Sequence, residues 1–416
     1  MKFFPLLALG AISTFPALAA PKPAKKAVKP TAKPTKPAIK PVAPTLAPLG
    51  EGVPAFQVRP GFRVTLVAKD FGEARFIEFD DKGTLYVSQP GSGTIAALRL
   101  KSGTYQKIAD FTTDKPRVHG LDFHSGWLWF TQSGSVWKAR DTNGDGKCDE
   151  EIQVLKDLPE GGGHWWRSIL VGDDGFYTSI GDAGNADIPE GDTADRQKIW
   201  KYNLDGTGKT LFSEGIRNTE KLRFRPGTNE VYGADHGSDN FGKNLGESGK
   251  NQPVTDQIPP CEFNHYEAGK FYGHPFIVGN GMARPEYASR PDILELATKN
   301  TLPAWQLGAH WAPNGWNFAN TNALGMKGDA FIACHGSWNS SKRVGYRVER
   351  VLFDAVTGRA MGAQNLVSTI NSNDDVVGRP CDVAEAPNGT LLFSDDQNNA
   401  IYRIEKLMAK NSKVSK

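Results

Sequence analysis

Histidines and arginines gather in glycine- and tryptophan-rich, loop-like stretches of this chain. The clearest stretch is "GGGHWWRSILVGDDGFYTSIGD" (residues 161–182), with His164 near its start and Asp182 at its end. A neutral imidazole can take up a proton near pH 7, so His164 is a candidate general base. The alternative is a packing role beside two tryptophans. Other polar candidates are His119, Arg217, Asn218, His236, His310, His335 and Arg379.

Several common catalytic motifs are missing from the sequence. There is no His-x-x-x-His pair, which disfavours a histidine-bound catalytic zinc. A Gly-x-Ser-x-Gly nucleophile elbow is also missing, and none of the four cysteines lies in a Cys-x-x-Cys-His haem motif.

The stretch "DTNGDGKCD" (residues 141–149) predicts a calcium site. Oxygen-bearing side chains at positions 1, 3, 5 and 9 can wrap a hard cation, and a glycine at position 6 permits the tight turn. Position 12 holds Ile152 instead of the glutamate of a full EF-hand, so we expect a shorter calcium hairpin with a structural role. The alternative is an acidic turn. The predicted metal residues here are Asp141, Asn143, Asp145, Lys147 and Asp149.

The elements that position these residues form a repeat. An apolar run, a turn, a "G-x-L-Y-V"-like strand and a polar loop recur, and no amphipathic helix of length separates the units. The pattern predicts an all-β fold, a six-bladed β-propeller of four-stranded antiparallel blades, with long insertions in blades four and five. We expect "FRVTLVAKDF" from Phe62 to pair with the last blade and close the ring. The six units begin at Arg75, His119, Arg167, Lys221, Gly328 and Arg379.

The ends of the chain differ from this body. Residues 1–20 read as a signal peptide, so we expect export to the periplasm or the extracellular space. Residues 21–50 form a Pro/Lys/Ala-rich linker, which suits a spacer or contact with an anionic cell surface. The propeller is assigned to 51–408 and a basic tail to 409–416.

The charge balance argues against a nucleic-acid partner. The chain has 49 basic and 46 acidic residues, and eight of the lysines lie in residues 1–50. The body therefore has 41 basic against 46 acidic residues, so the basic balance of the whole chain comes from its first 50 residues and does not indicate nucleic-acid binding.

Together these segments resemble the soluble pyrroloquinoline quinone (PQQ)-dependent sugar dehydrogenases, the glucose, sorbosone and pyranose dehydrogenase group of six-bladed propellers. The resemblance covers most of residues 60–406. The segments that carry it are "HWWR…IGD" from His164, "GIRN…HGS" from Gly215, "PPCEFNHYEAGKFYGHP" from Pro259, "HGSWN" with "GYRV" from His335, and "GRPCDVAEAPNGTLLFSDD" from Gly378.

This resemblance implies hydride transfer from a sugar hydroxyl carbon to PQQ, with electrons passed to an external acceptor such as a cytochrome or a quinone. It implies three catalytic residues: His164 as general base, Asp182 as its hydrogen-bonding partner, and Arg217 beside the quinone carbonyl. The carbonyls of Gly237 and Ser238 would bind the cofactor's Ca²⁺. The cofactor-binding residues would be Arg75, His119, Asn218, His236, His335 and Arg379.

Two departures from the family pattern put substrate choice in doubt. His119 and His236 stand where the soluble glucose enzymes have glutamines, and the lysine expected on blade five is not evident.

Two other functions remain open: a calcium-dependent sugar lactonase, and a non-catalytic propeller that binds carbohydrate or protein. The latter would account for six tryptophans in loop-like stretches, which can stack on sugars or quinones or simply pack: Trp165, Trp166, Trp305, Trp311, Trp316 and Trp338. Cys334 and Cys381 occupy matching places on the last two blades, so we expect them within disulfide reach.

Overall fold

The computed structural model describes residues 49–407. The predicted signal peptide, most of the linker and the basic tail lie outside these described residues. Within them, no helix combines the length and apolar character needed to cross a membrane.

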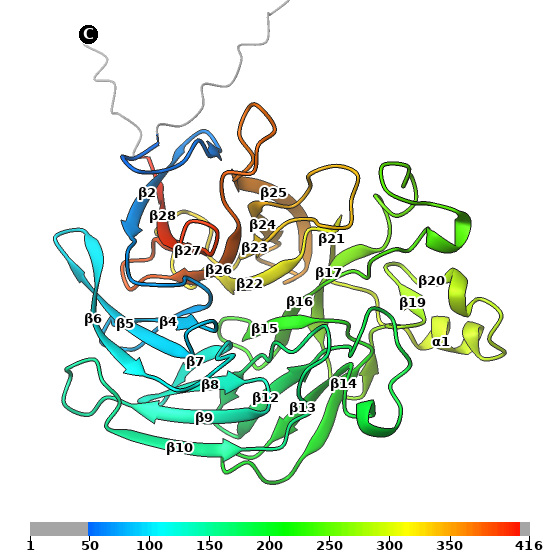
Figure 1. The fold of residues 1–416 in the computed structure, drawn as a ribbon, viewed down its shortest axis with the longest axis horizontal. Helices are drawn as coiled ribbons and strands as arrows, with labels where there is room; N and C mark the ends of the chain where they lie inside the picture. The colour runs from blue at the N-terminus through cyan, green and yellow to red at the C-terminus, as the bar shows by residue number, and fades with distance from the viewer. Residues whose placement is uncertain (1–48, 408–416) are drawn as a thin grey trace, which may run out of the picture. The chain divides into compact units, whose positions relative to one another are not determined.

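Six antiparallel sheets follow one another around a ring, which confirms the predicted six-bladed propeller (Figure 1). Each blade runs from an inner strand to an outer one. Blade one is β3 (Ile77–Phe79), β4 (Leu85–Gln89), β5 (Thr94–Lys101) and β6 (Thr104–Thr112). Blade two is β7 (Leu121–His124), β8 (Trp127–Gln132), β9 (Ser135–Arg140) and β10 (Glu150–Leu155). Blade three is β11 (Leu170–Gly172), β12 (Gly175–Ile180), β13 (Lys198–Tyr202) and β14 (Thr210–Glu214), extended by a short parallel strand, β18 (Lys270–Phe271).

The other three blades complete the ring. Blade four is β15 (Thr219–Phe224), β16 (Val231–Asp235), β17 (Pro260–Tyr266) and β21 (Trp305–Ala309). Blade five is β22 (Pro313–Phe318), β23 (Ala330–Cys334), β24 (Arg347–Phe353) and β25 (Ala360–Ser368), with β1 (Gln57–Val58) added at its edge. Blade six is β26 (Pro380–Glu385), β27 (Leu391–Asp395), β28 (Ala400–Lys406) and β2 (Phe62–Ala68).

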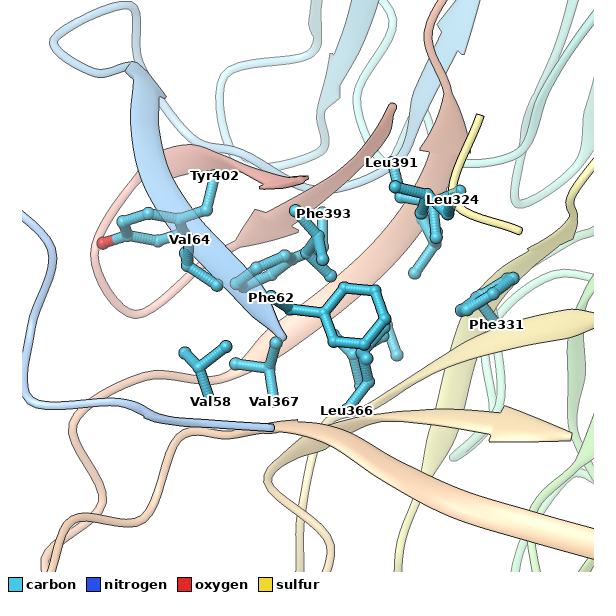
Figure 2. Close-up of a cluster of buried hydrophobic side chains, with 14 of the residues drawn as sticks. Val58, Phe62, Val64, Leu324, Phe331, Leu366, Val367, Leu391, Phe393 and Tyr402 are labelled. Atoms are coloured by element: carbon cyan, nitrogen blue, oxygen red, sulfur yellow. The ribbon is translucent and has the colours of Figure 1, made fainter. Parts of the chain in front are cut away.

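The strand from Phe62 closes the ring as predicted. β2 pairs antiparallel with β28, from Phe62 opposite Lys406 to Ala68 opposite Ile401, so the two ends of the propeller share one sheet (Figure 1). Phe62 and Val64 also enter the hydrophobic cluster between blades five and six (Figure 2). A comparable buried cluster lies at each of the other five blade interfaces.

This packing explains why the second strands are so apolar. A blade is covered by a neighbour on each face, so both faces of its central strands are buried. The "LYVSQ" of β4 and the "GFYTSI" of β12 are buried at every position, as are β16, β23 and β27.

Both long insertions belong to blade four. They are residues 236–259, between β16 and β17, and residues 267–304, between β17 and β21. Together they contain β18, β19 (Ile277–Val278), β20 (Met282–Ala283), α1 (Ile293–Lys299) and two short 3₁₀ helices, Lys243–Leu245 and Pro285–Tyr287; a third, Gly191–Thr193, lies in blade three. The prediction of a long insertion in blade five was wrong, because strand periodicity alone does not assign an irregular segment to a blade.

The predicted Cys334–Cys381 disulfide was also wrong. All four cysteines are free thiols. Cys334 ends a second strand, β23, whereas Cys381 lies in an inner strand, β26, so their places on the two blades do not match. The two side chains belong to different hydrophobic clusters.

Buried charged side chains of β15 reach across the axis of the ring to residues of other blades. A register shift between Thr219 and Leu222 interrupts the normal alternation of this strand, and Glu220, Lys221 and Arg223 all bond to other blades. Lys221 Nζ lies 2.7 Å from both carboxylate oxygens of Asp382 on blade six. Arg223 pairs with Glu78 of blade one and lies 3.4 Å from Asp122 of blade two.

We expect Lys221→Met to lower the free energy of unfolding by about 3–5 kcal/mol, because it leaves the buried Asp382 carboxylate without its cation. Urea unfolding followed by tryptophan fluorescence measures the loss. Lys299→Met removes the solvent-exposed Lys299–Glu295 pair and should change stability by less than about 0.5 kcal/mol. Equal losses in the two variants would contradict a structural role for the buried charges.

Candidate active site

The candidate residues lie at two kinds of position in each blade. Some precede an inner strand, and others follow a second strand. Because neighbouring strands in a blade are antiparallel, both positions fall at the same end of the ring. The first group is Arg75, His119, His164, Arg217, Asn218 and Arg379, and the second is Asp182, His236 and His335. We call this end the mouth.

The ring of His164 is held by the backbone. Its Nδ1 lies 3.0 Å from the carbonyl oxygen of Asp182. A carbonyl only accepts, so Nδ1 carries the proton and Nε2 keeps the lone pair that a general base needs. Burial, together with the positive charge of Arg217, lowers the pKa of His164 to about 3. The imidazole is therefore neutral at physiological pH.

The carboxylate of Asp182 binds His274 and not His164, the partner we predicted. It lies 2.6 Å from Nε2 of His274 and accepts a 3.0 Å hydrogen bond from the side chain of Gln197. The backbone amides of Gly184 and Asp187 donate to it as well. Burial alone would raise the pKa of Asp182, but the hydrogen bond from His274 keeps it below its usual value. Asp182 thus contacts His164 only through its backbone.

His274 is the residue that our sequence reasoning missed. It lies in the second insertion of blade four, where no repeat register indicates the position of a side chain. The segment that holds it, "FYGHP", was noted in the sequence without a role for the histidine. Burial lowers the pKa of His274, so it acts as a neutral donor to the ionised Asp182.

Arg217 is fixed beside His164. Its Nε donates to the carbonyl of Asn185 at 2.9 Å, and its Nη2 donates to the side chain of Asn185 at 2.9 Å and to Asp239 at 3.0 Å. The carboxylate of Asp235 accepts the backbone amides of Arg217 and Asn218 at 2.8 and 2.7 Å, which sets the start of β15.

Glu220 is the buried carboxylate at the centre of the mouth. It lies 3.4 Å from His119, 3.5 Å from Arg75 and 3.8 Å from His236, and it accepts a 3.0 Å hydrogen bond from Asn218. Burial would raise the pKa of Glu220, but the neighbouring histidines and Arg75 hold it well below its usual range. One carboxylate therefore joins four of the six predicted cofactor-binding residues.

Asp396 binds His335, and Arg379 is attached to the group through the backbone of His335. The Asp396 carboxylate lies 2.6 Å from Arg75 and 2.9 Å from Nε2 of His335, and Arg379 Nε donates to the backbone carbonyl of His335 at 3.2 Å. Burial works against ionisation, yet the hydrogen bond from His335 and the charge of Arg75 lower the pKa of Asp396 to about 2.

Trp166 packs between Arg75 and His119. The Arg75 guanidinium lies 4.2 Å from the centre of its ring, and the ring of His119 lies 4.5 Å away. Trp165 packs against Trp166 at 3.6 Å between ring centres. Part of the tryptophan-rich stretch therefore packs against residues of the mouth.

The structure does not assemble the predicted calcium ligands. Within residues 49–407 no three histidine, cysteine or acidic side chains are grouped so that they could hold a metal. Carboxylates of Asp141, Asp145 and Asp149 accept hydrogen bonds from backbone amides of their own loop, including that of Lys147, and the Asn143 side chain donates to Asp149. The loop joins β9 to β10, so it lies at the opposite end of the ring from the mouth.

Two adjoining pockets open in the mouth, and both are lined by Arg217, His236 and Gly237. The first continues to Ser238 and His274, and the second to His310 and Trp338. A side chain at Gly237 would lie 2.7 Å from the carbonyl oxygen of Pro260, so this close approach of two backbone segments requires glycine. Ser238 accepts a hydrogen bond from the buried Arg284.

The fold and the mouth define the class of this protein: a six-bladed β-propeller with a buried, charge-paired and histidine-rich site at one end of its ring. A model of the TrAA12-like family matches residues 56–407, so the chain belongs to that family.

Individual relatives agree with this assignment. An uncharacterised protein of Borreliella burgdorferi is 28% identical over 369 residues, covering 84% of this chain and 90% of that protein. The pyrroloquinoline quinone-dependent pyranose dehydrogenase of Coprinopsis cinerea is 23% identical over 72% of this chain. The matched part is 45% of that enzyme, so this chain corresponds to less than half of it.

Solved structures share the fold. The calcium structure of the Trichoderma reesei family AA12 enzyme has a TM-score of 0.73 at 19% identity, covering 85% of this chain and 98% of that one. The holo form of the pyranose dehydrogenase PQQ domain of Coprinopsis cinerea has a TM-score of 0.72, also at 19% identity, covering 86% and 99%.

We expect Arg217→Met to raise the pKa of His164 from about 3 toward its ordinary value of 6.5, because it removes a positive charge and leaves Asp239 without its arginine partner. An NMR titration of the histidine ring nitrogens measures the shift. Arg379→Met is the matched control: Arg379 lowers the pKa of His335, so its loss should affect that histidine and leave His164 unchanged. A His164 pKa that stays near 3 in Arg217→Met would show that burial alone sets it.

Proposed function

We propose that this protein oxidises a sugar hydroxyl, with hydride transferred to bound PQQ and the electrons passed to an external acceptor. The observation that carries the proposal is the neutral His164, whose Nδ1 is engaged by the Asp182 carbonyl while Nε2 remains free beside Arg217. The family assignment and the names of the Coprinopsis relatives support the same chemistry.

The mouth suits a ligand of this kind. PQQ carries three carboxylates, so its site must supply cations and hydrogen-bond donors. Arg75, Arg217 and Arg379 bring three guanidinium groups to the mouth. In addition, Nε of Arg75 is buried and without a hydrogen-bond partner among the described residues. Such donors are costly to bury unless a ligand or water satisfies them.

The bound quinone supplies the hydride acceptor, and the chain supplies proton transfer and charge stabilisation. His164 Nε2 accepts the proton of the sugar hydroxyl as the adjacent carbon loses its hydride. Arg217 stabilises negative charge that develops beside it, and its fixed contacts with Asn185 and Asp239 mean that it need not reorganise. Asn218 and His236 would hold the cofactor, and His236 lines both pockets of the mouth.

The low pKa of His164 fits a site completed by an anion. A base with a pKa of about 3 is too weak to take a proton efficiently near neutral pH. The positive charge of Arg217 causes part of the depression, so an anionic ligand beside Arg217 offsets it and raises the pKa of His164 toward the working range. Cofactor binding and activation of the base are thereby coupled.

Ca²⁺ would bind at the mouth only together with the cofactor. Because no ready-made cluster of metal-binding side chains lies within residues 49–407, a Ca²⁺ at the mouth would rely on the backbone carbonyls of Gly237 and Ser238 together with oxygens of the cofactor.

The lactonase alternative has less support. Such an enzyme would need a ring of free carboxylates and amides around one metal. Here the mouth carboxylates Glu220, Asp239 and Asp396 are each paired with an arginine, a histidine or both.

For the redox reaction we propose a cytochrome or a quinone as the external electron acceptor. The protein and its acceptor would meet outside the cytoplasm, after the export that residues 1–20 predict.

Sugar-dependent reduction of an artificial acceptor tests the function. Purified full chain is loaded with PQQ and Ca²⁺ and offered glucose, other aldoses and sorbosone. We expect turnover only with the cofactor present. A complete lack of turnover across this panel, with PQQ shown to be bound by its absorbance, would refute the proposal.

His164→Ala should lower kcat by about 10²- to 10⁴-fold, because it removes the base, while PQQ binding stays within a few-fold of wild type. His124→Ala is the matched control: this histidine lies in β7 and contacts Asp173, away from the mouth. Full activity in His164→Ala would assign the base to another group, with His274 the next candidate.

A further inference from the structure

A second hollow lies beside the mouth, between the first insertion of blade four and the loop that follows β23. We call it the outer groove. Amides, hydroxyls, two lysines and the carboxylate of Glu247 line it together with one large aromatic ring; its other principal members are Asn240, Lys243, Lys250, Gln252, Trp338 and Asn339.

Trp338 is the unusual member of this groove. Its surface is 76% exposed, whereas tryptophans in folded proteins are mostly covered. Within residues 49–407 its indole N–H has no hydrogen-bond partner, and its ring has no aromatic or cationic neighbour at stacking distance. The ring face and the N–H are therefore both available to a ligand.

The walls of the groove are held in place. Asn240 and Asn339 form a reciprocal pair: the Asn240 amide donates to the Asn339 side chain at 2.7 Å, and Asn339 Nδ2 donates to the Asn240 side chain at 2.9 Å. Asp256 accepts the amide of Ser341 at 2.8 Å. The tryptophan thus projects from a loop whose position is fixed before any ligand arrives, which lowers the entropic cost of binding.

The outer groove is continuous with the mouth. Trp338 lines both the groove and the inner pocket that holds Arg217, His236 and His310. A ligand that lies across the indole therefore extends from the groove toward Arg217, the residue assigned to charge stabilisation.

We propose that the outer groove is a subsite for a neutral oligosaccharide, whose terminal unit enters the mouth while the next units lie across Trp338. The axial C–H groups of a pyranose ring form a flat apolar face that packs on an indole, and its equatorial hydroxyls pair with planar amides such as Asn240, Gln252 and Asn339. The inference deepens the proposed sugar oxidation and rests on it for the identity of the ligand, while binding at the groove can be measured without turnover.

Direct binding tests the subsite. Glucose, cellotetraose and maltotetraose are titrated into the full chain by calorimetry, with and without PQQ. We expect at least one tetraose to bind about tenfold more tightly than glucose, and Trp338→Ala to remove that gain. Trp338→Phe should keep part of it because a ring face remains. Leu294→Ala, which truncates an 80% exposed side chain on α1 in the second insertion of blade four, is the matched control and should have no effect.

Each other result overturns the subsite. If neither tetraose binds better than glucose, or if the gain survives in Trp338→Ala, the groove does not hold saccharide units. If Trp338→Ala raises the KM for a protein electron acceptor and leaves tetraose binding unchanged, the groove is instead a docking surface for the acceptor. Failure of the proposed function is distinguishable, since it shows as absent turnover of all sugars whatever the calorimetry gives.

Discussion

The structure depends on matching the charges that one bulged strand brings to the axis of the propeller. An ionised side chain buried without a partner costs several kcal/mol, so Glu220, Lys221 and Arg223 of β15 must each meet an opposite charge. Their partners lie on blades one, two and six, which are remote from blade four in the sequence. These pairs are satisfied only when the ring is closed. Hydrophobic clusters bind each blade to its neighbours, and the ionic contacts connect blades across the axis.

The same arrangement prepares the mouth. Glu220 contacts two histidines and an arginine, and Asp396 contacts Arg75 and His335, so these side chains are already oriented. Preorganised charges stabilise a developing charge without a cost of reorganisation. The same environment weakens His164 as a base, because burial and the positive charge of Arg217 lower its pKa to about 3. Function at such a site requires an anionic ligand that offsets the positive charge and raises the pKa of His164.

Prediction from sequence worked where a local pattern has a direct physical cause. The repeated strand units predict the propeller because blades packed on both faces need apolar strands, and the edge strand from Phe62 needs a partner. The mouth residues were predicted because they flank these strands. The insertions of blade four have no such register, so His274 and the partners of Asp182 were missed. Cys334 and Cys381 illustrate the same limit: similar distances along a repeat did not imply the same strand of the blade.

The sequence by itself determined the fold class and the group of residues that meet at the mouth, because strand periodicity and antiparallel pairing are local properties. It did not determine every blade boundary, since the unit predicted from Gly328 begins just before the second strand of blade five, whose inner strand starts at Pro313. Tertiary structure alone decided how those residues are connected. The Asp182 backbone orients His164 while its carboxylate binds His274, Glu220 links the cations of several blades, and Trp338 lies exposed between two hollows. The Glu220 contacts join blade four to blades one and two, and only closure of the ring brings those atoms together, whereas the contacts of Asp182 depend on how blade three packs against the second insertion of blade four.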